Sequence, residues 1–153
     1  MNNLGIYVHI PFCKKKCNYC DFISFPCKDH LIENYFIALE KEIDNFNIEN
    51  REISTIYIGG GGTPSYPDSK YIIEILETIK NNYLLTADCE ITIEVNPGTV
   101  NKEKLLSYKN AGFNRLSIGL QTTSNRLLKL IGRIHTYEDF LETYERSKNL
   151  RIY

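Results

Sequence analysis

Hydrophobic and polar positions follow two different periods along this chain, and the period switches repeatedly. Short, β-branched apolar runs are typical of strands, and they fall at 4–10, 53–58, 90–95 and 115–120. Between these runs, apolar residues recur every three or four positions, as on one face of a helix. This second pattern predicts helices at 28–47, 68–83, 101–110, 124–131 and 136–150.

Several predicted boundaries carry local signals. Gly112 follows the helix at 101–110 and suits its C-terminal cap. Thr136 and Asp139 resemble a capping box with Asp in place of the usual Glu. Residues 151–153 are typical of the start of a fifth strand.

Alternation of strands and helices predicts a parallel sheet with right-handed crossovers. Four units and the start of a fifth indicate an α/β fold: a partial (β/α) barrel of parallel strands with outer helices, truncated near strand five. Residues 1–153 would then form the N-terminal part of a core domain, with the C-terminal domain absent. In such barrels chemistry gathers at the C-terminal ends of the strands, so the segments that follow them are the candidate site.

Composition narrows the class of protein. The chain has 153 residues, with 42% hydrophobic residues, 24% charged residues and a net charge of −1. This balance is ordinary for one soluble domain and offers no basic surplus for nucleic acid or anionic lipid. No apolar run reaches the roughly 18 residues that a membrane span needs. Free cysteines and the lack of a signal segment predict a cytoplasmic protein.

Cys13, Cys17 and Cys20 form a C-x3-C-x2-C motif just after the first predicted strand. Three thiolates on one loop can hold three irons of a cubane cluster and leave the fourth open, whereas clusters that only carry electrons usually take four cysteines. An open metal position can bind and activate a substrate. A structural zinc completed by His30 or Cys27 is an alternative, and the odd cysteine count disfavours a disulfide framework.

The two remaining cysteines lie outside this motif. Cys89 begins a predicted buried strand and is interpreted as a core thiol. Cys27 is interpreted as an inert loop thiol. The lysines 14–16 between the first two motif cysteines could offset an anionic cluster, but a solvated loop is the simpler interpretation.

Four glycines, at 59–62, follow the second predicted strand and precede Thr63, Pro64 and Ser65. Glycines let a backbone pass close to a ligand and present its amides and carbonyls without side-chain bulk. Phosphate-loop interpretations fail, because no Lys-Ser/Thr pair follows and a proline falls where G-x-G-x-x-G needs glycine.

Three polar residues follow later strands or lie beyond them. Glu94 ends the third strand and suits an ammonium or ribose hydroxyls. Gln121 follows the fourth strand and offers a neutral donor and acceptor. Arg133 could grip a carboxylate with two hydrogen bonds. Each would more often be an ordinary polar residue if it stood alone.

The segments YVHIPFC, YCDF, GGGTPS, EVNPG, LSIGLQT and GRIHT occur in this order over essentially the whole chain. Together they closely resemble the oxygen-independent coproporphyrinogen III oxidase-like family of radical S-adenosylmethionine (SAM) proteins. The resemblance implies a 4Fe–4S cluster on Cys13, Cys17 and Cys20. It also implies a SAM site made by Tyr7, Tyr19, Gly61, Gly62, Thr63, Glu94, Gln121 and Arg133.

The family has two main branches. One decarboxylates two propionates of coproporphyrinogen III to vinyl groups by way of a 5′-deoxyadenosyl radical; the other binds heme and is regarded as a heme chaperone. The first branch typically has a further cysteine where this chain has Phe22, and a longer N-terminal arm. The resemblance therefore favours a heme chaperone fragment.

Two departures from the family pattern matter. The loop has four glycines rather than three, so Gly61 and Gly62 are assigned by counting back from Thr63. The later strands and the C-terminal domain with its heme-associated motif are expected to be missing.

Three hypotheses follow: a heme chaperone fragment, a coproporphyrinogen oxidase, and an inactive or zinc-bound remnant. The partners implied are SAM, heme or a porphyrinogen, and an electron donor such as flavodoxin or ferredoxin. Self-association or a missing C-terminal half would cover the exposed sheet edges.

Overall fold

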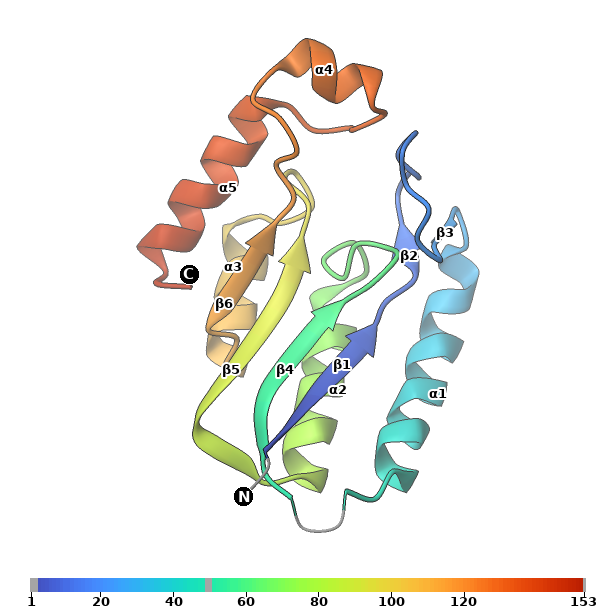
Figure 1. Cartoon of the computed structure of the whole chain (residues 1–153), viewed down its shortest axis with the longest axis vertical. Coiled ribbons are helices and arrows are strands. Elements are labelled where there is room, and N and C mark those ends of the chain that lie inside the picture. The colour runs from blue at the N-terminus through green and yellow to red at the C-terminus, as the bar shows by residue number, and fades with distance from the viewer. Residues whose placement is uncertain (1–2, 49–50, 153) are drawn as a thin grey trace.

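The computed structural model describes residues 3–48 and 51–152, which form a twisted sheet flanked by helices (Figure 1). Four strands make up the main sheet in the order β1-β4-β5-β6, and each neighbouring pair is parallel. The predicted parallel α/β arrangement is therefore confirmed. The strands are β1 (Leu4–His9), β4 (Ile53–Gly59), β5 (Leu85–Val95) and β6 (Arg115–Ile118).

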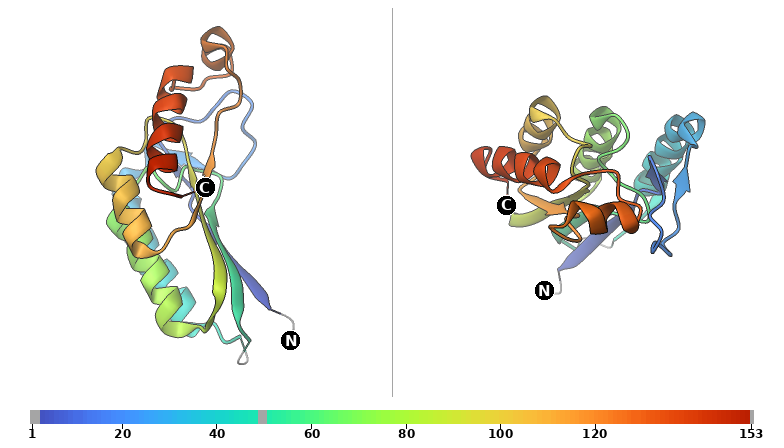
Figure 2. Two further views of the ribbon diagram at one scale, coloured as in Figure 1. Left: turned by 90° about the vertical axis from the view of Figure 1, so that its left-hand side faces the viewer. Right: turned by 90° about the horizontal axis from the view of Figure 1, so that it is seen from above.

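The helices that were expected from the apolar spacing are present. Figure 2 shows α1, α2 and α3 along one face of the sheet, and α5 packs against α3 and β6. None of the helices in the described ranges is long and apolar enough for a bilayer crossing. The helical elements are the 3-10 turn η1 (Asp29–Leu31), α1 (Ile32–Asn45), α2 (Ser69–Asn82), α3 (Lys102–Ala111), α4 (Asn125–Leu130) and α5 (Tyr137–Asn149).

The helix ends follow their sequence signals. The Asn101 side chain accepts a hydrogen bond from the Lys104 amide at the start of α3, and Gly112 ends this helix with a φ of 108°. Only a residue without a Cβ takes that conformation at no steric cost. The capping box of Thr136 and Asp139 is formed in both directions at the start of α5.

The hydrophobic core lies between the sheet and helices α1 to α3. Alternate strand residues such as Ile58 and Ile93 are fully buried there. The side chain of Phe36 in α1 stacks on Tyr71 in α2, with ring centroids 4.9 Å apart. Cys89 belongs to this core, which confirms its interpretation as a core thiol. The strand residues in between face the opposite side of the sheet, where the candidate site lies.

Two very short strands were missed by the sequence analysis. β2 (Phe12–Cys13) and β3 (Phe25–Pro26) pair in parallel with each other. Two residues are too few for a periodic pattern, so no signal was available. Their pairing brings together the two ends of the segment that carries the three motif cysteines.

The expected fifth strand is not formed by the residues that are described. Arg151 lies in a turn with a φ of 53°, and Ile152 belongs to no strand. Their amides instead bond back to the Lys148 and Ser147 carbonyls at the end of α5, and Ile152 is buried. Tyr153 lies outside the described residues.

Candidate functional site

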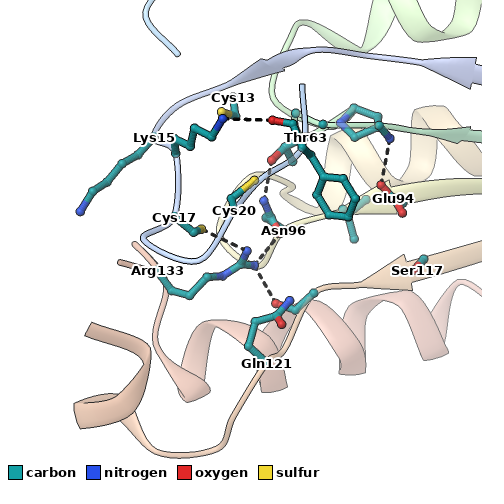
Figure 3. Close-up of a pocket in the computed structure, with 18 of the residues that line it drawn as sticks. Cys13, Lys15, Cys17, Cys20, Thr63, Glu94, Asn96, Ser117, Gln121 and Arg133 are labelled. Carbon is teal, nitrogen blue, oxygen red and sulfur yellow. Dashed lines mark hydrogen bonds between the residues drawn. The ribbon is translucent and has the colours of Figure 1, made fainter. Parts of the chain in front are cut away.

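A cavity of about 620 Å³ lies at the C-terminal ends of the sheet strands, a size typical of small-molecule sites. The loops after β1, β4, β5 and β6 contribute to it, together with the segment that carries the cysteines (Figure 3). Every site residue expected from the sequence lines this cavity. These residues are Tyr7, Cys13, Cys17, Tyr19, Cys20, Gly61, Gly62, Thr63, Glu94, Gln121 and Arg133.

The cysteine segment arches over one side of the cavity and is held at several points. The Phe25 amide donates to the Pro11 carbonyl at 2.7 Å. At the far side, Asn18 donates from its backbone amide to the Ile131 carbonyl and from its side chain to the Leu130 carbonyl, at 3.0 and 2.9 Å. These hydrogen bonds tie the base of the segment together and its middle to the end of α4.

The three motif thiols are free and differ in exposure. Cys13 is buried, whereas Cys17 and Cys20 are half-buried. Burial raises the pKa of the Cys13 thiol, the neighbouring Cys20 and Cys17 thiols add to this rise, and Ser24 and the Lys16 ammonium offset only part of it. Within residues 3–48 and 51–152, no three His, Cys, Asp or Glu side chains are grouped closely enough to hold a single metal ion.

The glycine-rich loop packs directly on the cysteine segment. The Thr63 amide donates to the Phe12 carbonyl at 2.7 Å, and the Gly62 amide donates to the Ile10 carbonyl at 3.0 Å. A Cβ added at Gly61 would lie 1.7 Å from the Ile23 carbonyl oxygen, far inside any allowed contact. These glycines thus serve the contact between two loops, a role that the sequence analysis did not foresee.

The fourth glycine has a separate role. Gly59 is the last residue of β4, and a Cβ there would lie 2.5 Å from the Tyr57 ring and 3.0 Å from a carboxylate oxygen of Glu94. The extra glycine therefore makes room for the hydrogen-bonded pair of Tyr57 and Glu94. Counting back from Thr63 places Gly61 and Gly62 at the cavity, as expected.

Glu94 is oriented through both of its carboxylate oxygens. The Tyr57 hydroxyl donates to Oε1 at 2.6 Å, and the Gly60 amide donates to Oε2 at 3.2 Å. Burial raises the pKa of Tyr57, and its hydrogen bond to Glu94 raises it further. Tyr57 was missed by the sequence analysis, because it lies within a β-branched run that was interpreted only as a strand.

Arg133 reaches the cavity from the segment after α4. Its Nη2 donates to the Asn96 Oδ1 at 2.5 Å and to the Gly119 carbonyl at 2.7 Å, and its Nη1 lies 3.7 Å from the Cys17 sulfur. Gln121 lies at the same side with a φ of 69°, which is uncommon for a residue with a side chain. Such strained backbone is often found at binding sites.

Comparison with known proteins now adds to this geometry. The family model described as “Radical SAM superfamily” matches residues 7–153. The chain belongs to the radical SAM superfamily. Members of this superfamily in general use a 4Fe–4S cluster and SAM.

Individual relatives point to one part of the superfamily. The chain is 40% identical over 150 residues to “Heme chaperone HemW” of Buchnera aphidicola from Acyrthosiphon pisum, covering 96% of this chain and 40% of that protein. It is 43% identical over 135 residues to the Escherichia coli protein of the same name, covering 86% and 35%. The chain thus spans 33–40% of the length of these and the other curated relatives that it matches.

A solved structure has the same fold. Coproporphyrinogen III oxidase (HemN) from Escherichia coli, described as a radical SAM enzyme, superposes with a TM-score of 0.88 at 31% identity. The match covers 98% of this chain and 35% of that one. The fold expected from the resemblance is confirmed.

Three features of this cavity were not recognised from the sequence. Tyr57 holds Glu94, Asn96 contacts Arg133, and the His9 ring lies between the glycine-rich loop and the cysteine segment. The His9 Nε2 lies 3.2 Å from the Ile23 carbonyl oxygen and 3.4 Å from the Gly61 amide nitrogen. The available signal was position: His9 and Asn96 lie at or just after a strand end, where a barrel places its chemistry.

Proposed function

We propose that this radical SAM chain holds a 4Fe–4S cluster through Cys13, Cys17 and Cys20. One observation carries the proposal: three free thiols from one loop and polar groups from four other segments line a single cavity. Such convergence of separate loops is expected of a ligand site and not of solvated surface.

SAM is the second ligand that we propose for this cavity. Arg133 supplies a cation for the SAM carboxylate, and Glu94 supplies acceptors for the ribose hydroxyls or the ammonium group. Gln121 offers a neutral donor and acceptor to adenosine or methionine. The other proposed SAM residues shape the cavity wall: Tyr7, Tyr19, Gly61, Gly62 and Thr63.

The cluster, when bound, supplies the electron that cleaves SAM reductively. The protein groups have positioning roles. Arg133 and Glu94 would hold different groups of SAM, and the packed glycine loop fixes the cavity wall against the cysteine segment. The electron donor that we propose is a flavodoxin- or ferredoxin-like protein.

We further propose that the chain acts in heme metabolism as the N-terminal part of a heme chaperone, with the C-terminal domain outside residues 1–153. The names of the two bacterial relatives described above support this assignment. Phe22, at the position where the oxidase branch typically has cysteine, supports it too. Heme or a porphyrinogen would be the partner molecule, and the cytoplasm the compartment.

Coproporphyrinogen oxidation is the second candidate, favoured by the structural match to an oxidase. The two can be separated by giving the reduced, cluster-loaded product of the full-length gene SAM and coproporphyrinogen III, with CO2 and vinyl products measured by mass spectrometry. Hemin titration of the same full-length protein, followed by absorbance, is the parallel experiment, because the heme-associated motif is expected outside residues 1–153. A chaperone predicts saturable heme binding without decarboxylation; SAM-dependent CO2 release would contradict it.

A further inference from the structure

Asn96 uses both ends of its side-chain amide to join two parts of the site. Its Oδ1 accepts from the Arg133 Nη2 at 2.5 Å, and its Nδ2 donates to the Thr63 Oγ1 at 2.5 Å. The orientation of the amide is chemically determined, because a guanidinium can only donate and must face the oxygen. Figure 3 shows Asn96 between Arg133 and the Thr63 loop.

No carboxylate contacts Arg133 among the described residues. Besides Asn96, its contacts are the Gly119 carbonyl, the Tyr19 hydroxyl and the Cys17 sulfur, which would be a thiolate in the cluster-loaded protein. The ion pairs found among the described residues involve Lys80, Arg115 and Arg146, and none involves Arg133. A half-buried guanidinium that is held in place but pairs with no protein carboxylate is suited to a ligand carboxylate.

The space around this pair is also tightly constrained. A Cβ added at Gly119 would lie 2.8 Å from the Asn96 Oδ1 and 3.0 Å from the Arg133 Nη2. The Asn96 backbone is fixed as well, because its carbonyl accepts from the Thr99 hydroxyl at 2.6 Å. The amide therefore has little freedom to leave Arg133.

We propose that Asn96 is a positioning residue that orients Arg133 without neutralising it. The cation is thereby kept for the carboxylate of the ligand. This inference rests on the SAM site proposed above. An aspartate at position 96 would have nearly the same shape and would still accept from Arg133. It would also form an ion pair and repel a ligand carboxylate, so a neutral amide is the group that this role requires.

The test compares SAM with decarboxylated SAM, which lacks the carboxylate, by calorimetric titration of cluster-loaded protein. Four proteins are used: the unaltered chain, Asn96→Ala, Asn96→Asp and the control Asn101→Asp. The control makes the same chemical change at the N-cap of α3, where asparagine and aspartate are equally suitable. Iron content and the cluster absorption of each protein are measured first.

We expect Asn96→Ala to weaken SAM binding about tenfold, and Asn96→Asp to weaken it more although the acceptor is retained. The affinity for decarboxylated SAM should change less than threefold in either variant. Asn101→Asp should bind both ligands with the affinities of the unaltered chain. SAM affinity in Asn96→Asp equal to that of the unaltered chain would overturn the inference. Equal losses for both ligands, or loss of the cluster in both Asn96 variants, would overturn it too. If the unaltered chain loads its cluster but binds no SAM, the proposed function fails first.

Discussion

At the scale of single residues, Arg133 joins the cysteine segment to the strand ends. Its guanidinium contacts the Cys17 sulfur on one side and Asn96 and Gly119 on the other. Burial raises the pKa of the neighbouring Tyr19, and the charge of Arg133 opposes this rise. One cation thus acts on both the proposed cluster side and the proposed SAM side of the cavity.

Replacing Arg133 by alanine should weaken SAM binding without changing the binding of the cluster. We expect Arg133→Ala to weaken SAM binding at least about tenfold, because a charge-assisted contact commonly contributes about 1.5–3 kcal/mol. Iron content should stay unchanged, since the cluster is held by thiolates. Equilibrium dialysis with labelled SAM measures the first quantity, and Arg126→Ala, an exposed position on α4, is the control. Unchanged SAM affinity with an intact cluster would remove Arg133 from the site.

At the scale of elements, the site depends on one loop packed on another. The glycine-rich loop follows β4, and the cysteine segment lies between β1 and η1. They meet at Gly61 and Gly62, where only hydrogen atoms fit against the backbone of Ile23 and Phe12. The position of the thiols therefore depends on residues that carry no chemistry themselves.

Adding one methyl group at this contact should displace the cysteine segment. We expect Gly61→Ala to lower the iron bound after anaerobic reconstitution to less than about half of the unaltered value, because the Cβ would lie 1.7 Å from the Ile23 carbonyl oxygen. Gly98→Ala is the control: its Cβ meets nothing within 4 Å, although the φ of 78° makes it a strained position. The control should lose about 1–2 kcal/mol of stability and keep its iron. Full iron loading in Gly61→Ala would show that the loops can separate without harm.

Prediction from sequence succeeded for the fold, where a period carries the signal: the long helices and the parallel strands were found in this way. The cysteines were singled out by their spacing and Arg133 by its place and the family resemblance; all of them line the cavity, and their ligands stay predictions. Prediction failed for β2 and β3, which are too short for any period, and for residues 151 and 152, which wrap around the end of α5. Tyr57 and Asn96 were missed for another reason: their importance lies in a hydrogen bond to a residue more than 30 positions away.

At the scale of the whole molecule, buried tyrosines make the stability of the fold depend on pH in the alkaline range. Burial raises the pKa of Tyr35, Tyr57 and Tyr108 among others, so the folded protein retains protons that the unfolded chain releases. The contribution of these protonated tyrosines to the free energy of unfolding is complete below the ordinary tyrosine pKa of about 10. It is lost as the pH rises above that value. Lys104, whose pKa is lowered by burial, acts in the opposite direction.

Tyr108 offers a direct test, because its buried hydroxyl has no hydrogen-bond partner among the described residues. Tyr108→Phe should stabilise the fold by about 1 kcal/mol at pH 8, since an unpaired polar group is removed. It should also lose less stability than the unaltered chain between pH 8 and pH 11. Urea unfolding at both pH values measures this, with the exposed Tyr144→Phe as control. A destabilised Tyr108→Phe protein would contradict the assignment.

The two edges of the main sheet suggest how the chain behaves in solution. Within the described residues, β1 and β6 each pair on one side only. Large apolar side chains such as Phe46, Leu84 and Leu130 are more than half exposed. We expect the 153-residue protein to self-associate, and sedimentation velocity at rising concentration should show dimers or larger species. A stable monomer at all concentrations would contradict this.

The central claim is that three cysteines on one loop hold a cluster with an open iron. The most direct measurement is iron analysis and absorption spectroscopy after anaerobic reconstitution, with and without SAM. The account predicts about four irons per chain and a spectrum that changes when SAM is added. Cys13→Ala, Cys17→Ala and Cys20→Ala should each abolish both results, whereas the exposed Cys27→Ala and the core Cys89→Ala should keep them. Stoichiometric zinc without iron, or a full cluster in any of the first three variants, would contradict the account.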